Sequence, residues 1–275
     1  MITLANFSRK TIIGGLSLLL ILASPLSSPA FERSQNDAGT VCYFWVNRNV
    51  IFSINKNCSQ DVDKTACIQA VQDSLAAWTG PSCSDLVLTY AGTTTQTSIG
   101  MDCLNLIVWR QSNDWNYDKS AIAMTTTTFS KVSGQIFDAD IELNGVDYIF
   151  ATSGASNAMD IQNTLTHELG HCIGLADLID TADSTETMFF NADYGDINKR
   201  TLSPDDINGL CTIYPVGMKT PLCIGQQEIS SVGDCSSSGG GCATTAVSSE
   251  NIFTFTFLAL LLWLSRKYFR RVTLG

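Results

Sequence analysis

Two histidines with a glutamate beside the first are the residues best suited to chemistry in this chain. His167 and His171 are the only two histidines among 275 residues, and Glu168 follows the first. Histidines four positions apart project from one face of a helix and could bind one tetrahedral zinc ion. Glu168 could reach a water at the metal without binding the metal itself. The three residues predict hydrolysis by a zinc-activated water, with Glu168 as general base.

A catalytic zinc ion needs a third protein ligand and an open position. The histidines belong to the stretch HELGHCIGLAD, which ends at Asp177, and Gly174 within it is well placed to end a helix. A turn at Gly174 would return the Asp177 carboxylate, an acceptable zinc ligand, to the two imidazoles. Asp180 and Asp183 are the alternative third ligands.

Hydrophobic spacing indicates the elements that must position these residues. A stripe of apolar residues four apart predicts a site helix over 160–175. A second helix is expected over 63–78, and a third begins at Ser203-Pro204, an N-cap followed by a first-turn proline. β-Branched and aromatic runs predict strands over 41–54, 85–90, 104–109, 121–129 and 134–143.

The site motif and its flanks resemble a known family. HELGHCIGLAD resembles the metzincin pattern HExxHxxGxx followed by a third ligand. The flanking stretches GQIFDADIEL and LSPDDINGLCTIYP are similar to those of the matrixin-like metalloproteases, of peptidase M10 type. The resemblance covers residues 41–216. It implies an α+β fold, the metzincin catalytic domain, with a twisted mixed β-sheet, a long active-site helix and a C-terminal helix.

The resemblance also implies a methionine turn below the zinc, for which Met188 is the candidate. The chain departs from the family in three respects. Its third ligand is Asp177 where most members carry histidine, and the spacer from Asp177 to Met188 is longer than is usual in matrixins. No histidine remains for a structural zinc ion, so one zinc ion is expected. Phe189, Phe190 and Tyr194 follow Met188 and suggest an apolar subsite.

A substrate-binding edge is a further implication of the resemblance. In matrixins an exposed edge strand pairs with the substrate backbone, and the matching stretch here is 121–127. Ala121, Ile122, Ala123 and Met124 are therefore expected to bind substrate. A plain edge strand is the alternative.

Acidic residues alternate along the strand expected over 134–143. Asp138, Asp140 and Glu142 would share one strand face, because side chains two apart point the same way. They could help to hold Ca²⁺. Solvated charges near a hairpin are the alternative.

Ten cysteines follow residue 30, and an exported chain can keep such residues as disulfides. The absence of a CxxC pair argues against a cysteine-rich zinc knuckle. A disulfide between Cys172 and Cys211 would join the site helix to the last helix. Cys223 and Cys235 could close a loop in the linker.

Both ends of the chain are expected to lie outside the fold. Residues 1–30 combine two basic residues, an apolar run and Ser28-Pro29-Ala30, which predicts a signal peptide. Residues 251–275 combine an apolar run with four basic residues, and a Ser/Gly/Cys-rich linker over 223–250 precedes them. This transmembrane tail resembles bacterial C-terminal sorting tails of the Gly-Cys type, which are cleaved. A plain membrane anchor is the alternative.

The part between the two ends is strongly acidic. It would comprise a short N-terminal segment, 31–40, and the catalytic domain, 41–222. Residues 31–250 carry all 26 acidic but only 10 of the 16 basic residues, a net charge of 10 − 26 = −16. Phosphates would be repelled, which argues against nucleic acid as a partner.

The sequence as a whole predicts a secreted or bacterial cell-surface zinc metalloendopeptidase. It would act as a monomer on protein or peptide substrates and meet the membrane through its C-terminal tail before processing. One alternative is a zinc-bound surface binding protein without turnover, although Glu168 would then have no purpose. The other is a zinc hydrolase acting on cell-wall peptide cross-links.

Overall fold

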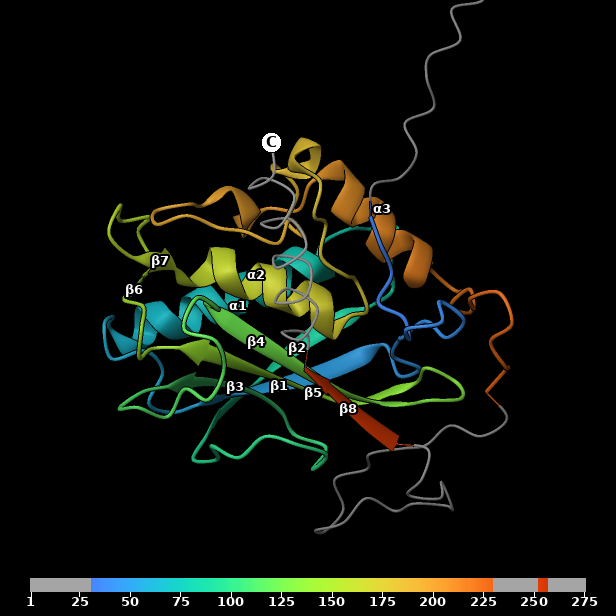
Figure 1. Ribbon diagram of the computed structural model, residues 1–275, viewed down its shortest axis with the longest axis horizontal. Coiled ribbons are helices and arrows are strands. Elements are labelled where there is room, and N and C mark those ends of the chain that lie inside the picture. Colours follow the sequence, from blue (N-terminus) through green and yellow to red (C-terminus); the bar gives the residue numbers. More distant parts are fainter. Residues whose placement is uncertain (1–30, 230–251, 257–275) are drawn as a thin grey trace, which may run out of the picture.

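A mixed β-sheet forms one layer of the fold (Figure 1). The computed structural model describes residues 31–229 and 252–256. The sheet strands are β1 (Asn49–Asn55), β2 (Val87–Thr94), β3 (Asn105–Arg110), β4 (Ala123–Ser130), β5 (Ile136–Asn144) and β8 (Ile252–Thr256). Their order is β2-β1-β3-β5-β4-β8. The first four in that order pair in parallel, whereas β4 is antiparallel to both of its neighbours.

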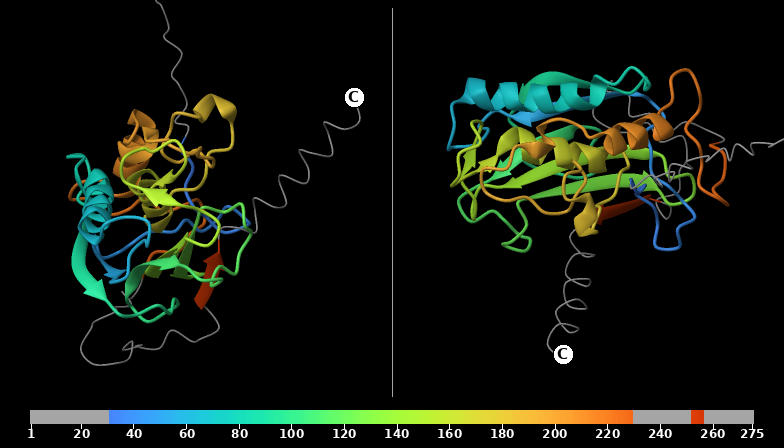
Figure 2. Two further views of the ribbon diagram at one scale, coloured as in Figure 1. Left: turned by 90° about the vertical axis from the view of Figure 1, so that its left-hand side faces the viewer. Right: turned by 90° about the horizontal axis from the view of Figure 1, so that it is seen from above.

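Two helices, α1 (Lys64–Thr79) and α2 (Ile161–Cys172), lie side by side on one face of the sheet (Figures 1 and 2). A short parallel pair, β6 (Phe150–Ala151) and β7 (Met159–Asp160), precedes α2. The fully buried Trp78 of α1 donates its indole N–H to the Thr166 carbonyl of α2 at 2.8 Å. This arrangement of a mixed sheet and helices confirms the predicted α+β class.

The predicted apolar stripe fixes α2 against the rest of the core. Ile161, Leu165, Leu169 and Ile173 are all fully buried. Burial of each such side chain contributes about 1.5–3 kcal/mol, so the stripe determines which face of α2 turns away from the core. The histidines lie on that other face.

The third helix, α3 (Pro204–Ile213), begins as its sequence predicts. Ser203 Oγ accepts from the Asp206 N–H at 3.2 Å, and Asp206 Oδ2 accepts from the Ser203 N–H at 2.9 Å. This reciprocal capping box satisfies two N–H groups that the first turn would otherwise leave unpaired. Two 3₁₀ turns, η1 (Thr181–Asp183) and η2 (Asn198–Arg200), lie between α2 and α3.

Two predicted boundaries were wrong. The strand expected over 41–54 starts only at Asn49. The preceding segment instead anchors α2, since Trp45 donates its indole N–H to the Cys172 carbonyl at 2.8 Å. The site helix ends at Cys172, before the predicted Leu175, because Gly174 has a φ of +96°. A Cβ atom at Gly174 would lie 2.4 Å from the Tyr43 carbonyl oxygen, so only glycine fits this turn.

The disulfides differ from both expected pairings. Cys42 pairs with Cys223, Cys58 with Cys67, and Cys83 with Cys211. The predicted Cys172–Cys211 bond is therefore wrong, and so is the Cys223–Cys235 loop. Cys172 is a free thiol, fully buried in the core, whereas Cys211 lies on the partly exposed side of α3 and meets the loop after α1.

The Cys83–Cys211 disulfide should be a main source of stability, because it closes a loop across 128 residues. We expect its removal in a Cys83→Ala/Cys211→Ala variant to lower the free energy of unfolding by about 3–5 kcal/mol. Chemical denaturation monitored by circular dichroism measures this. Cys172→Ala, which removes only a buried thiol, should cost about 1 kcal/mol. A larger loss in Cys172→Ala than in the double variant would contradict the pairing.

The predicted signal peptide, 1–30, lies outside the described residues. Of the predicted tail, only Ile252–Thr256 is described, as β8 on the outer edge of β4. The linker is described as far as residue 229, and Gln226 there donates to the Cys42 carbonyl at 2.9 Å. No helix in 31–229 or 252–256 is long and apolar enough to cross a membrane.

Candidate active site

The structure brings together His167, His171 and Asp177. The helix α2 presents both imidazoles on one face, and the turn at Gly174 returns the chain toward them. Asp177 Oδ1 lies 3.3 Å from His167 Nε2 and 3.4 Å from His171 Nε2. One ligand atom from each of the three residues lies within 4.8 Å of the others. Three nitrogen and oxygen ligands so arranged can hold one metal ion.

Backbone carbonyls fix the orientation of both imidazoles. His167 Nδ1 lies 2.8 Å from the Thr187 carbonyl oxygen, and His171 Nδ1 lies 2.9 Å from that of Leu175. A carbonyl can only accept, so each Nδ1 carries a hydrogen, and in the neutral ring the Nε2 that faces Asp177 keeps its lone pair. This is the tautomer that a metal-binding histidine needs.

The electrostatics of this group favour a positive charge at its centre. Burial lowers the pKa of His167, and the charge of Lys199 lowers it further. Burial also opposes the charged form of His171, but Asp177 outweighs burial and raises the pKa of His171 to about 9. Burial would raise the pKa of Asp177, yet the two imidazoles hold it well below its ordinary value. The carboxylate therefore stays ionised, ready to bind a cation.

Glu168 lies at the same site but outside the ligand group. It is only 7 % exposed, and Thr125 Oγ donates to its Oε2 at 2.6 Å. Thr125 belongs to β4. A residue of the sheet therefore orients the Glu168 carboxylate of α2. The sequence did not single out Thr125, because it lies in a run of four threonines that indicates only a strand.

Met188 forms an apolar floor beneath α2. The side chain is 1 % exposed, and a Cβ atom at Gly170 would lie 2.2 Å from Met188 Sδ. Asp206 of α3 holds this turn, since its carboxylate accepts from the Thr187 N–H at 2.9 Å and the Met188 N–H at 3.3 Å. Asp206, the N3 residue of the α3 capping box, thus also positions the turn whose Thr187 carbonyl fixes His167.

Gly170→Ala should disturb this floor, because the added methyl group overlaps Met188. We expect the free energy of unfolding to fall by about 1–3 kcal/mol, a typical cost of overpacking. Urea denaturation of the wild type and the variant measures the difference. Gly80→Ala is the matched control, as Gly80 has a helical φ of −67° and its nearest neighbour would lie 3.3 Å away. An equal loss in both variants would contradict a special role for Gly170.

A cleft of about 310 Å³ adjoins these residues. Asp177, His167, His171 and Glu168 line one side, and the predicted substrate-binding residues, Ala121, Ile122, Ala123 and Met124, line another. β8 covers the outer edge of β4 only from Thr126 to Ser130. The substrate-binding edge predicted over 121–127 is thus covered by β8 at Thr126 and Thr127. From Ala123 to Thr125, β8 does not pair with this edge, which there adjoins the cleft.

Asp138 and Asp140 lie elsewhere, on β5, and both are 1 % exposed, so the alternative of solvated charges is wrong. Asp140 accepts from the Gly100 N–H at 2.8 Å and the Leu106 N–H at 2.9 Å. Asp138 faces Asp140 and the Cys103 backbone N–H, but neither of its carboxylate oxygens makes a hydrogen bond of good geometry with the described residues. Burial, reinforced by Asp140, raises the pKa of Asp138 to about 9, and burial raises that of Asp140 to about 7.

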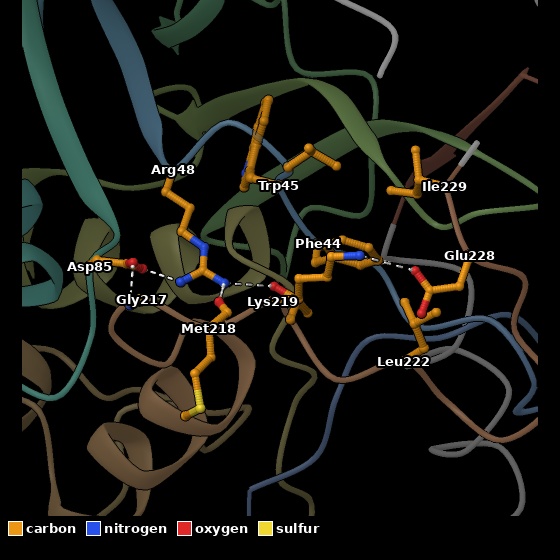
Figure 3. A pocket seen from close by; sticks show the side chains of 12 residues that line it. Phe44, Trp45, Arg48, Asp85, Gly217, Met218, Lys219, Leu222, Glu228 and Ile229 are labelled. Carbon is orange, nitrogen blue, oxygen red and sulfur yellow. Dashed lines mark hydrogen bonds and ion pairs between the residues drawn. The ribbon is translucent and has the colours of Figure 1, made fainter. Parts of the chain in front are cut away.

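A larger cavity, of about 520 Å³, shares no lining residue with the cleft (Figure 3). Arg48 is one of its lining residues, and it forms an ion pair with Asp85 and donates to the carbonyls of Pro215 and Met218. These partners occupy the guanidinium and tie the segment after α3 to the sheet. His167, Glu168, His171 and Asp177 line only the smaller cleft.

An α+β domain whose helix α2 carries two histidines and a glutamate at this spacing defines a metalloprotease-type protein. The family model of Matrixin, Peptidase_M10, matches residues 44–215, and the chain belongs to that family. No curated protein matches the chain.

Proposed function

We propose that this protein is a zinc-dependent endopeptidase that hydrolyses peptide bonds in the cleft beside α2. The observation that carries the proposal is the convergence of two Nε2 atoms on Asp177 Oδ1, at 3.3 and 3.4 Å. That oxygen is buried and has no hydrogen-bond partner among the described residues. A buried carboxylate oxygen that faces two imidazole nitrogens and makes no hydrogen bond fits a zinc ion.

His167, His171 and Asp177 would hold the metal. Zinc, when bound, would supply a Lewis acid that polarises the scissile carbonyl. Glu168 would take the proton of the attacking water and deliver it to the leaving amine. Thr125 supports this role, because its hydroxyl hydrogen bond to Oε2 fixes the carboxylate in one orientation.

The uncovered edge of β4 would bind the substrate backbone. Main-chain pairing with Ala123, Met124 and Thr125 would add an extended peptide to the sheet. Thr125 would then serve two purposes, since its backbone faces the peptide while its side chain orients Glu168. An extended peptide bound there lies beside the general base, as the reaction requires.

Hydrolysis assays on the zinc-loaded protein test the proposed function. Casein and cell-wall fragments serve as substrates, each with and without a chelator. Casein cleavage that the chelator abolishes supports an endopeptidase. Cleavage of cell-wall fragments alone would favour a hydrolase of peptide cross-links, and zinc binding without any turnover would favour a surface binding protein.

Export is a second part of the proposal. Three disulfides in the described residues fit an oxidising compartment, because cytosolic proteins rarely keep such bonds. We propose that residues 1–30 direct export and that the C-terminal tail anchors the protein before processing at a bacterial cell surface. Mass spectrometry of the protein recovered from cells would place both mature ends. An N-terminus retained at Met1 would contradict the signal peptide.

We also propose that Asp138 and Asp140 help to bind Ca²⁺. Without a cation, two buried carboxylates stabilise the fold only while they are protonated, because both pKa values are raised. That contribution is complete below about pH 4 and is lost as the pH rises through 7 to 9. Calcium would replace the protons and restore stability at high pH.

We therefore expect Asp138→Asn to be more stable than the wild type at pH 9 without calcium, by on the order of 2 kcal/mol. The difference should shrink toward pH 5, and calcium should stabilise only the wild type. Denaturation at several pH values, with and without Ca²⁺, measures both effects. Asp37→Asn, on an exposed residue, should follow the wild type throughout. A stability difference that does not change with pH would contradict the raised pKa values.

A further inference from the structure

Lys199 is a buried lysine at the back of the catalytic cleft. It lies on η2, is only 3 % exposed, and lines the cleft together with Asn163, Thr164 and His167. No ion pair joins it to a carboxylate within the described part of the chain. Buried charges in proteins are normally paired, so this one calls for a partner.

The hydrogen bonds of Lys199 leave it unsatisfied. Its Nζ donates to the Phe189 carbonyl. It also lies 3.4 Å from His167 Nδ1, but that nitrogen carries a hydrogen that points to the Thr187 carbonyl. Two donors cannot satisfy each other, and an ammonium has three hydrogens to donate. Two of the three therefore lack an acceptor among the described residues.

Asn163 and Thr164 also carry buried polar atoms that lack a hydrogen-bond partner among the described residues. The Asn163 side-chain oxygen accepts from the Lys199 backbone N–H at 2.8 Å. The other end of the Asn163 amide is therefore the donor, Nδ2. That Nδ2 is buried and has no partner among the described residues, and the same holds for Thr164 Oγ. Asn163 is 1 % exposed and Thr164 is 6 % exposed. Three side chains on one wall of the cleft thus offer donors with nothing to receive them.

An apolar wall in the cleft would favour an apolar substrate side chain, but the cleft has only part of such a wall. Of the three aromatic residues after Met188, only Phe190 lines the cleft. Phe190 is 41 % exposed, so it lies toward the mouth, whereas the donors lie at the buried end. A long side chain that enters past Phe190 would therefore meet a positive charge and an amide N–H at its tip.

We propose that this wall is a subsite for an acidic substrate side chain, Glu or Asp, at a residue flanking the scissile bond. Lys199 supplies the positive charge and Asn163 a second donor. The subsite adjoins the reaction centre, because Lys199 Nζ lies 3.4 Å from an imidazole that also faces Asp177. This inference deepens the proposed function and depends on it for the identity of the substrate. A carboxylate satisfies both donors, whereas a neutral amide leaves the charge unpaired.

The first experiment measures the cleavage preference of the zinc-loaded protein. A library of peptides randomised at the two residues flanking the cleaved bond identifies the favoured side chain. Matched peptides with Glu, Gln or Leu at that position then give kcat/KM values. We expect kcat/KM for the Glu peptide to exceed that for the Leu peptide by about 10-fold to 100-fold, which is the gain that a charge-assisted hydrogen bond provides. A preference for large apolar side chains would overturn the subsite.

Lys199→Met tests the assigned residue, because methionine keeps the length of the side chain and removes the charge. The Glu/Leu ratio should fall to near one. A ratio of rates within one preparation does not depend on how much of the variant carries metal. Lys219→Met is the matched control, since Lys219 has a 91 % exposed side chain and lies outside the cleft. Equal losses for all peptides at an unchanged ratio would show that Lys199 acts only on the fold, and would overturn the proposal.

Lys199→Gln is the second variant, in case the methionine variant does not fold. It retains a donor without the charge, so it should lose the discrimination between Glu and Gln. Binding supplies a readout that needs no turnover. Fluorescence anisotropy with labelled Glu and Leu peptides on the Glu168→Gln protein should show the same order of affinity. If no peptide is cleaved but the Glu peptide binds more tightly, the proposed function fails and the acidic subsite stands.

Discussion

Replacing Glu168 by Gln is expected to lower kcat/KM for peptide hydrolysis by about 100-fold to 10,000-fold, the usual contribution of a general base. Glutamine has the same shape but cannot take a proton at neutral pH. Its side-chain oxygen could still accept the Thr125 hydrogen bond of 2.6 Å, so the local geometry should persist. Glu168 is not one of the three grouped ligands, so zinc content should stay at one ion per chain.

Peptide hydrolysis and metal analysis on the same preparations measure both consequences. Glu228→Gln is the matched control, because it removes a carboxylate with a 77 % exposed side chain and should change neither quantity. Activity retained in Glu168→Gln would show that another group moves the proton. Activity lost together with zinc would mean that Glu168 acts on the metal site rather than in the reaction.

The grouping of His167, His171 and Asp177 could be predicted from the sequence because its geometry is local. The spacing of His167 and His171 puts both rings on one helical face, whatever surrounds the helix. The turn at Gly174 brings back Asp177 within three residues, and the structure groups Asp177, not Asp180 or Asp183, with the histidines. Both helix starts with a clear cap, at Asp63 and Ser203, also follow from local hydrogen bonding.

What the sequence could not show depends on contacts between distant segments. Cys211 pairs across 128 residues with Cys83, and no spacing rule distinguishes that partner from the other cysteines. Lys199 and Thr125 reach the cleft from η2 and β4, so their positions follow only from how those elements pack on α2. The pairing of β4 with β8 is equally non-local, since a strand edge carries no sequence signal for its partner.

Asp177→Ala is expected to weaken zinc binding by at least about 100-fold. Even residues that merely hold a ligand in place contribute 10-fold to 100-fold to metal affinity, and Asp177 would be a ligand itself. Its removal leaves two imidazoles with no negative charge between them, where the wild type has a carboxylate 3.3 and 3.4 Å from the two nitrogens. Asp177→His should retain zinc, because imidazole is also a good zinc ligand.

Competition with a fluorescent zinc chelator measures the affinities directly, and thermal unfolding gives an independent readout. Bound zinc stabilises the folded state by mass action, so a chelator should lower the Tm of the wild type but not that of Asp177→Ala. Asp180→Ala and Asp183→Ala are the controls, since these are the other carboxylates that a turn after α2 could have brought to the histidines. If Asp180→Ala or Asp183→Ala lost zinc while Asp177→Ala kept it, the ligand would be misassigned. If all three kept it, two imidazoles alone would hold the ion and no carboxylate would complete the site.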